Sequence, residues 1–148
     1  MLMNNQAAIV KAVCISEKKG TVKKSVPKIY AKEDYGIEGD AHAGEGHRQV
    51  SLLAEESVNK LCAKIPDIEA GVFAENILTA GIKLHALPVG ARLRVGEALI
   101  EVTQIGKKCH NNGCAIKQQT GDCVMPREGV FAKVLESGFI QQGDNIKE

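Results

Sequence analysis

Short apolar runs rich in β-branched residues recur along the chain, and glycine-marked turns separate them. Such runs are typical of strands, and they occur at residues 7–15, 49–53, 72–78, 91–95, 98–105 and 130–136. Gly96 and Glu97 lie between two of these runs and predict a tight hairpin turn, while Gly138 predicts a closing turn after the last run. The runs at residues 72–78, 91–95 and 98–105 predict a meander of strands.

Other segments interrupt this strand pattern. Residues 25–30 have a strand-like composition but contain Pro27, which restricts such a strand to a sheet edge or to a strand start. Residues 32–49 contain four glycines without periodicity and predict a long loop, and residues 17–20 predict a turn. Apolar residues at helical spacing predict a helix over residues 54–64, and a short helix is predicted at residues 115–119.

Length and composition fit one soluble domain. The chain has 148 residues and a mass of 15.9 kDa, with 44% apolar and 25% charged residues, so we expect a single domain over residues 1–148. Many short strands with one or two short helices predict a mostly β, barrel-like α+β fold. A net charge of +1, no Trp, two Tyr and three Phe argue against a nucleic-acid partner. Without a membrane-length apolar run or an export signal, a cytoplasmic location and no membrane partner are expected.

The first candidate site is the glycine-rich segment at residues 36–44. Glycines let backbone N–H groups approach an anion, and Asp40 and His42 add a carboxylate and an imidazole two residues apart. Such a segment suits a phosphate, a polar ring or a metal. The same residues also suit a purely local role, in which their side chains cap backbone groups. Arg48 adds a cation nearby in the sequence.

The second candidate site is a cysteine cluster at residues 107–127. Cys109 follows Lys107 and Lys108, and these two cations would lower the pKa of its thiol, which makes Cys109 the best candidate nucleophile. A metal site is the alternative, because four soft ligands are available there, although no Cys-x2-Cys knuckle is present: Cys109, His110, Cys114 and Cys123. Cys14 and Cys62 lie on apolar faces and are expected to be small core residues.

Taken in order, several stretches resemble the MOSC domain, found at the C-terminal end of molybdenum-cofactor sulfurases and as small free-standing bacterial proteins. They are GIEGDAHAG followed by RQVSLLAEES, then FAENILTAGIKLHALPVGARLRVGEALIEVTQIGKKC, and VFAKVLESGFIQQGDNI. The resemblance covers nearly the whole chain. It implies a β-barrel that binds the molybdenum cofactor (molybdopterin) or carries sulfur for cofactor sulfuration or metal–sulfur cluster maturation.

The resemblance also implies roles for individual residues. Cys109 matches the characteristic cysteine of the family, so it is expected either to hold a persulfide or to ligate molybdenum, with Lys107 favouring its thiolate. Arg48 or Arg127 is expected to neutralise the phosphate of the cofactor. The full set expected to bind the cofactor is Gly39, Asp40, His42, Gly44, Arg48, Asn76, Gln104 and Arg127.

The chain lacks a desulfurase domain and a lysine suited to an internal aldimine, so no covalently bound pyridoxal phosphate is expected. A sulfur-transferase activity would therefore need a separate pyridoxal-phosphate cysteine desulfurase as a partner, and a molybdoenzyme is the other partner class that the resemblance implies. Three alternatives stay open: a structural zinc module, a non-catalytic adaptor that delivers the pterin, and a pocket for an unrelated anion.

Overall fold

The computed structural model describes residues 8–16, 23–41, 43–44, 49–56, 75–105 and 129–148, and most of these lie in strands. The elements are β1 (Ala8–Ile15), β2 (Lys24–Val26), β3 (Lys28–Lys32), β4 (Gly36–Ile37), β5 (Val50–Ala54), β6 (Ile77–Ala80), the 3-10 helix η1 (Leu84–Ala86), β7 (Arg92–Val95), β8 (Ala98–Ile105), β9 (Val130–Glu136), β10 (Gly138–Gln141) and β11 (Asn145–Lys147). No helix in these ranges is long and apolar enough to cross a membrane.

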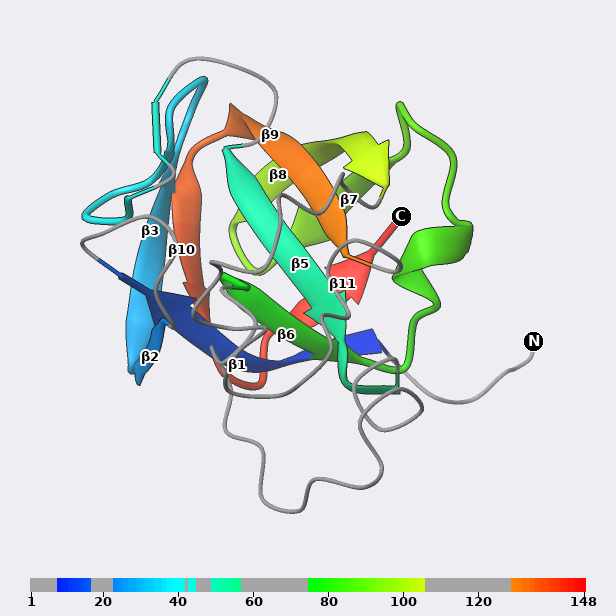
Figure 1. The fold of residues 1–148 in the computed structure, drawn as a ribbon, viewed down its shortest axis with the longest axis horizontal. Helices are drawn as coiled ribbons and strands as arrows, with labels where there is room; N and C mark the ends of the chain where they lie inside the picture. The colour runs from blue at the N-terminus through cyan, green and yellow to red at the C-terminus, as the bar shows by residue number, and fades with distance from the viewer. Residues whose placement is uncertain (1–7, 17–22, 42, 45–48, 57–74, 106–128) are drawn as a thin grey trace, which may run out of the picture.

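Seven of the described strands close into a barrel (Figure 1). The order around it is β11, β7, β8, β9, β5, β6 and β1, and β1 pairs again with β11 to complete the ring. Strand β2 extends this sheet beyond β1, and a second sheet has the order β10, β3, β4. Neighbouring strands of the barrel are antiparallel except for β5 and β6, which are parallel. The structure therefore confirms a mostly β, barrel-like fold.

The barrel interior holds the apolar core. Strand β7 alternates exposed Arg92 and Arg94 with buried Leu93 and Val95, the pattern of a strand with one face in a core and one in solvent. Strand β5 differs, because all five of its residues are buried. It lies between β9 and the parallel strand β6, and it has little contact with solvent on either face.

The structure confirms most of the predicted strands and their order. The hairpin turn at Gly96 and Glu97 joins β7 to β8 as expected. Three expectations were wrong. The meander expected over residues 72–78, 91–95 and 98–105 does not form, because β6 pairs with β1 and β5 and not with β7. The single strand expected at residues 25–30 is two strands, β2 and β3, because Pro27 breaks it. Gly138 starts strand β10 instead of a closing turn, because its backbone pairs with Ala31 of β3.

Other elements were not predicted or lie outside the described ranges. The expected loop at residues 32–49 contains the short strand β4, and β10, β11 and η1 were not foreseen. The predicted turn at residues 17–20 and the short helix at residues 115–119 lie outside the described residues. The predicted helix at residues 54–64 also lies outside them from residue 57 onward, and its start at Glu55 and Glu56 is helical.

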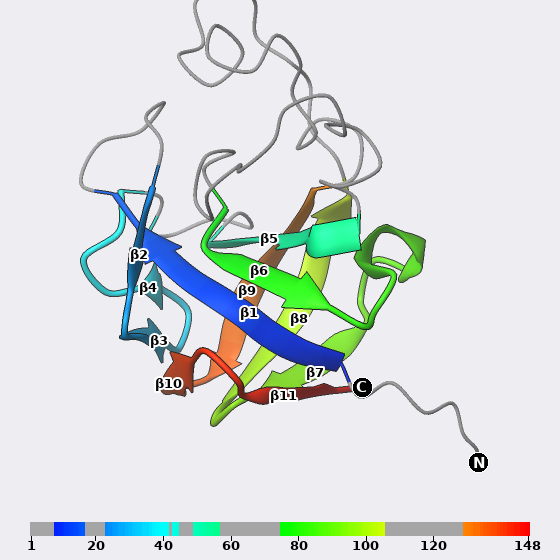
Figure 2. The same cartoon turned by 90° about the horizontal axis from the view of Figure 1, so that it is seen from below.

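Strand directions show which strand ends share one end of the barrel. Strand β6 is parallel to β5 and antiparallel to β1, so the C-terminal end of β1 and the starts of β5 and β6 share one end, here called the upper rim (Figure 2). Strand β9 is antiparallel to both β5 and β8, so β9 starts and β8 ends at the other end of the barrel. The turn between β7 and β8 lies at the start of β8, roughly 25 Å from the end of that strand.

Candidate functional site

A buried ion pair lies at the upper rim. Lys23 Nζ is 2.7 Å from Asp40 Oδ1, and neither side chain has exposed surface. Asp40 Oδ1 also accepts a hydrogen bond from the backbone N–H of Ser16 at 3.0 Å, and Lys23 Nζ lies 3.2 Å from Ser16 Oγ. Because Ser16 directly follows β1, the pair ties the start of the β2 segment and the glycine-rich segment to the end of β1.

Lys23 and Cys14 respond to burial in the way expected for groups removed from water. Burial lowers the pKa of Lys23 below its ordinary value, and the hydrogen bond and charge of Asp40 partly oppose this effect. Burial raises the pKa of the Cys14 thiol from 9.0 to about 12, and the carboxylate of Glu75 adds to the rise. Cys14 is therefore an inert, protonated thiol in the core, as its sequence context predicted.

Asn76 connects β1, β5 and β6 at the same rim. Its side-chain oxygen accepts hydrogen bonds from the backbone N–H and the hydroxyl of Ser51 at 3.0 and 3.2 Å. Its Nδ2 donates to the carbonyl oxygen of Cys14 at 3.1 Å, and the residue is fully buried. The structure thus brings Asn76 and Asp40 together on the end of β1, through Cys14 and Ser16 respectively. Both side chains are engaged with protein groups.

The glycine-rich segment is fixed by close backbone contacts. Gly36 has a φ of +118°, and a Cβ at this position would lie 2.6 Å from the carbonyl oxygen of Gln49. Gly39 and Gly44 also have positive φ values, +85° and +138°, but no atom lies within 4 Å of a Cβ at Gly44. Close packing therefore requires a glycine at Gly36, while Gly44 borders open space and its N–H donates to the carbonyl oxygen of Tyr35 at 2.6 Å.

Gln104 lies near the C-terminal end of β8, at the end of the barrel opposite the upper rim. In the barrel, β7 and β11 on one side and β9, β5 and β6 on the other separate β8 from β1. The pairing with β9 shifts register between Val102 and Gln104, and Thr103 Oγ1 donates to the carbonyl oxygen of Phe131 at 3.2 Å. Such an irregularity changes the direction of the side chains that follow it, and these are frequently functional positions.

The remaining predicted site residues lie outside the described residues: His42, Arg48, Lys107, Cys109 and Arg127. The alternative metal ligands His110, Cys114 and Cys123 lie there too. Within the described ranges, no group of three or more His, Cys, Asp or Glu residues is arranged to hold a metal ion.

Sequence reasoning missed two members of the rim cluster, Lys23 and Ser16. Lys23 lies in the run Val22, Lys23, Lys24, Ser25, where a lysine is usually solvated. No local signal separates it from its neighbour Lys24, which is exposed. Only the position of Asp40, 17 residues further along, makes Lys23 the buried cation.

The described residues of the upper rim suit a supporting role better than direct contact with an anionic ligand. Its buried charged groups are one cation, Lys23, and two carboxylates, Asp40 and Glu75, while the exposed Lys24 pairs with Ile15 at the end of β1. A phosphate-bearing cofactor needs cations and N–H donors, so this set fits the supporting layer of such a site and not its phosphate contacts. A ligand can approach the protein at Gly44, which borders open space, but the N–H of Gly44 is already bonded to the carbonyl oxygen of Tyr35.

A closed seven-stranded barrel with buried charged groups at one rim is the class of domain that the structure defines. A family model described as the MOSC domain matches residues 39–147. The chain therefore belongs to the MOSC domain family, whose members are associated with binding or sulfuration of the molybdenum cofactor.

Solved structures share the fold over nearly the whole chain. The YuaD protein of Bacillus subtilis is 22% identical, with a TM-score of 0.77 and coverage of 95% of this chain and 94% of its own. YiiM from Geobacillus stearothermophilus is 19% identical, with a TM-score of 0.69 and coverage of 94% and 73%. YiiM from Escherichia coli is 21% identical, with a TM-score of 0.65 and coverage of 97% and 69%. None of the curated proteins compared with the chain matches it.

Proposed function

We propose that this protein binds the molybdenum cofactor at the upper rim and carries sulfur on Cys109, for cofactor sulfuration or metal–sulfur cluster maturation. Membership of the MOSC family supports the cofactor class. The observation that carries the proposal is the buried pair of Lys23 and Asp40, which holds the glycine-rich segment on the end of β1. A buried ion pair adds little stability to a fold. Its presence here therefore supports a functional role for the fixed position of the glycine-rich segment.

Cys109 follows Ile105, the last residue of β8, by four positions. The end of β8 lies at the other end of the barrel from the upper rim, so the proposal to combine Cys109 with the glycine-rich segment rests on membership of the MOSC family and not on strand geometry.

Residues divide into those that support the site and those that contact the ligand. Asp40 and Asn76 act as positioning residues, because their side-chain atoms are bonded to Lys23, Ser16, Ser51 and Cys14. Gly39 offers a backbone N–H group, whereas the N–H of Gly44 donates to the carbonyl oxygen of Tyr35 at 2.6 Å. The proposed ligand contacts are His42, Arg48 and Arg127, and the two arginines neutralise the phosphate because the described rim buries only one cation. Gln104 is not among these contacts, because the end of β8 lies at the other end of the barrel.

Lys107 favours the thiolate form of Cys109, which is the reactive form. In sulfur loading, this thiolate attacks the terminal sulfur of a persulfide on a cysteine desulfurase. The S–S bond of the donor breaks, the donor cysteine leaves as a thiolate, and Cys109 keeps the transferred sulfur with its proton as a persulfide. When bound, the cofactor would supply a molybdenum centre for which a cysteine sulfur is a suitable soft ligand. A molybdoenzyme is the proposed acceptor, and the cytoplasm is the proposed location.

The test is mass spectrometry of the intact protein, purified without oxygen from molybdate-fed cells, with peptide mapping of every cysteine and a fluorescence assay for released pterin. The proposal expects one additional sulfur on Cys109 or a bound pterin, and loss of the additional sulfur in Cys109→Ala. Cys14→Ala is the matched control, because a buried thiol with a pKa of about 12 cannot accept sulfur. Sulfur loading that survives Cys109→Ala contradicts the carrier role. A protein that instead contains one zinc per chain and unfolds on chelation is a structural metal module.

A further inference from the structure

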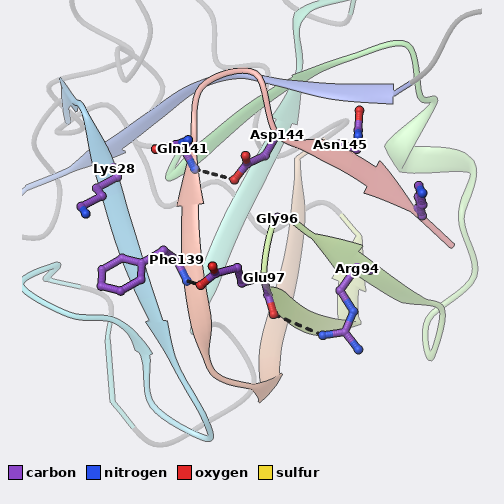
Figure 3. Close-up of a pocket in the computed structure, with 9 residues that line it drawn as sticks. Lys28, Arg94, Gly96, Glu97, Phe139, Gln141, Asp144 and Asn145 are labelled. Carbon is purple, nitrogen blue, oxygen red and sulfur yellow. Dashed lines mark hydrogen bonds between the residues drawn. The ribbon is translucent and has the colours of Figure 1, made fainter.

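A pocket lies beside the turn between β7 and β8, apart from the Lys23 and Asp40 pair. It has a volume of about 470 Å³, within the range typical of small-molecule sites. Its walls come from strands β3, β7, β10 and β11, from the turn between β7 and β8, and from the turn between β10 and β11 (Figure 3). Its lining residues are Lys28, Arg94, Gly96, Glu97, Phe139, Gln141, Asp144, Asn145 and Lys147. None of these residues was among the predicted site residues.

One wall of the pocket places two cations directly opposite each other. Arg94 of β7 and Lys147 of β11 are paired residues of neighbouring antiparallel strands, so their side chains leave the same face of the sheet. Like charges at paired positions destabilise a sheet unless an anion lies between them. Arg94 Nη2 is 3.1 Å from Glu136 Oε1, but that pair is largely exposed and therefore weak. In the described part of the chain, Lys147 has no ion pair.

The two carboxylates of the pocket accept hydrogen bonds from backbone N–H groups. Glu97 Oε1 accepts the N–H of Phe139 at 3.2 Å, and Asp144 Oδ2 accepts the N–H of Gln141 at 2.9 Å. These bonds draw both negative charges toward β10 and leave the opposite wall positive. The arrangement favours an anion near Arg94 and Lys147, with hydrogen-bonding groups beside it from Asn145 and the two carboxylates.

The other wall presents an aromatic ring. Phe139 is 44% exposed, which is unusual for a large apolar side chain. Lys28 Nζ lies 4.6 Å from its ring centroid, and the ring of Tyr30 meets it edge-on at 4.9 Å. In Figure 3, Lys28 and Phe139 lie on one side of the pocket and Arg94 on the other, with Glu97, Gln141 and Asp144 between them. An exposed ring opposite a cationic wall suits a ligand that has a flat ring at one end and an anion at the other.

We infer that this pocket binds a nucleoside monophosphate. The phosphate lies against Arg94 and Lys147, the sugar hydroxyls face Asn145 and the carboxylates of Glu97 and Asp144, and the base contacts Phe139. Gly96 permits this layout, because its φ of +57° and a Cβ only 2.9 Å from the carbonyl oxygen of Phe139 exclude a side chain there. The inference does not depend on Cys109 or on any residue of the upper rim.

The experiment is calorimetric titration of the full chain with AMP, GMP, CMP and UMP, and with ribose 5-phosphate and inorganic phosphate as the partial ligands. The inference expects at least one nucleotide to bind with a Kd below about 1 mM and more tightly than ribose 5-phosphate, which in turn binds more tightly than phosphate. Equal binding of nucleotide and ribose 5-phosphate overturns the role of the base. Absence of saturable binding by all four nucleotides overturns the inference entirely.

Matched variants locate the binding. Arg94→Gln and Lys147→Gln should each weaken nucleotide binding by about tenfold or more, because each removes a charged contact to the phosphate. Arg92→Gln is the control: Arg92 lies on the same strand, has a side chain that is 65% exposed, and does not line the pocket. Phe139→Leu should remove the preference for nucleotide over ribose 5-phosphate and keep the phosphate contacts. An equal loss in Arg92→Gln would show non-specific charge attraction and refute the assignment.

Discussion

Replacing Lys23 by methionine tests the buried pair most directly. The substitution keeps the length and apolar stem of the side chain but removes the cation that lies 2.7 Å from Asp40 Oδ1. Asp40 then keeps its bond from the N–H of Ser16 and loses its counter-charge in a site without exposed surface. Removing one partner of a fully buried pair costs about 3–5 kcal/mol. Native domains are stable by about 5–15 kcal/mol, so the variant should lose a large fraction of its stability.

The assay is urea unfolding followed by far-ultraviolet circular dichroism, since the chain has no Trp for a fluorescence signal. The expected loss corresponds to a fall in Tm of roughly 10 °C for a domain of this size. Lys23→Met/Asp40→Leu should recover most of the loss, because an apolar pair of similar volume leaves no charge unpaired. A loss below about 1 kcal/mol in Lys23→Met, or strictly additive effects in the double variant, would refute the buried pair.

Asp40→Asn should change how the free energy of unfolding depends on pH, and the direction of this change follows from the pKa of Lys23. Burial lowers the pKa of Lys23, so the folded protein releases the lysine proton at a lower pH than the unfolded chain. Between these two values the unfolded state binds more protons, and stability rises with pH up to the ordinary lysine value of 10.5. Without the Asp40 charge the pKa of Lys23 falls further, so the instability of Asp40→Asn relative to wild type should shrink as the pH rises toward 10.5.

Three further predictions concern single positions. The hydroxyl of buried Thr79 has no hydrogen-bond partner in the described part of the chain, so Thr79→Val should leave the free energy of unfolding unchanged or raise it by about 1 kcal/mol; a loss above that value would reveal a partner. Gly36→Ala should destabilise the protein by about 2 kcal/mol or more in urea unfolding, since its Cβ would lie 2.6 Å from the carbonyl oxygen of Gln49, while Gly143→Ala, with a positive φ but open space, should cost less; equal effects would contradict this reasoning. Because the pKa of Cys14 is about 12 in the fold and 9.0 in the unfolded chain, stability should fall with pH above about 9 by up to 1.4 kcal/mol per pH unit, and Cys14→Ala should remove that part of the fall.

The sequence predicted what local pattern determines. Strands β7 and β8 and their turn at Gly96 follow from alternation and from the residues that such turns require, and they were placed correctly. The parallel pairing of β5 with β6 and the closure of β1 on β11 were not predicted, because both join segments far apart in sequence. Gly138 shows the same limit: its glycine indicated a turn, but its pairing with Ala31 makes it the start of a strand.

The candidate site was predicted in the same partial way. The glycine pattern correctly marked the segment around Asp40 as one with positive φ values at several glycines. It gave no indication that the Asp40 carboxylate would be buried against Lys23, because a lysine beside another lysine gives no sign of burial. The nucleotide pocket had no sequence signal either. Arg94 and Lys147 are more than fifty residues apart and become neighbours only through the pairing of β7 with β11.

The double variant Lys23→Met/Asp40→Leu also separates stability from function at the upper rim. If the pair served only the fold, an apolar replacement that restores stability would also restore sulfur loading of Cys109 and pterin binding. The proposed function expects the opposite, because the apolar pair cannot hold the N–H of Ser16 through a carboxylate, and the glycine-rich segment loses its fixed position. We therefore expect a stable variant with less than about one tenth of the wild-type sulfur loading, while the Cys14→Ala control loads normally. Wild-type loading in a stable double variant would mean that the buried charges have no part in the site.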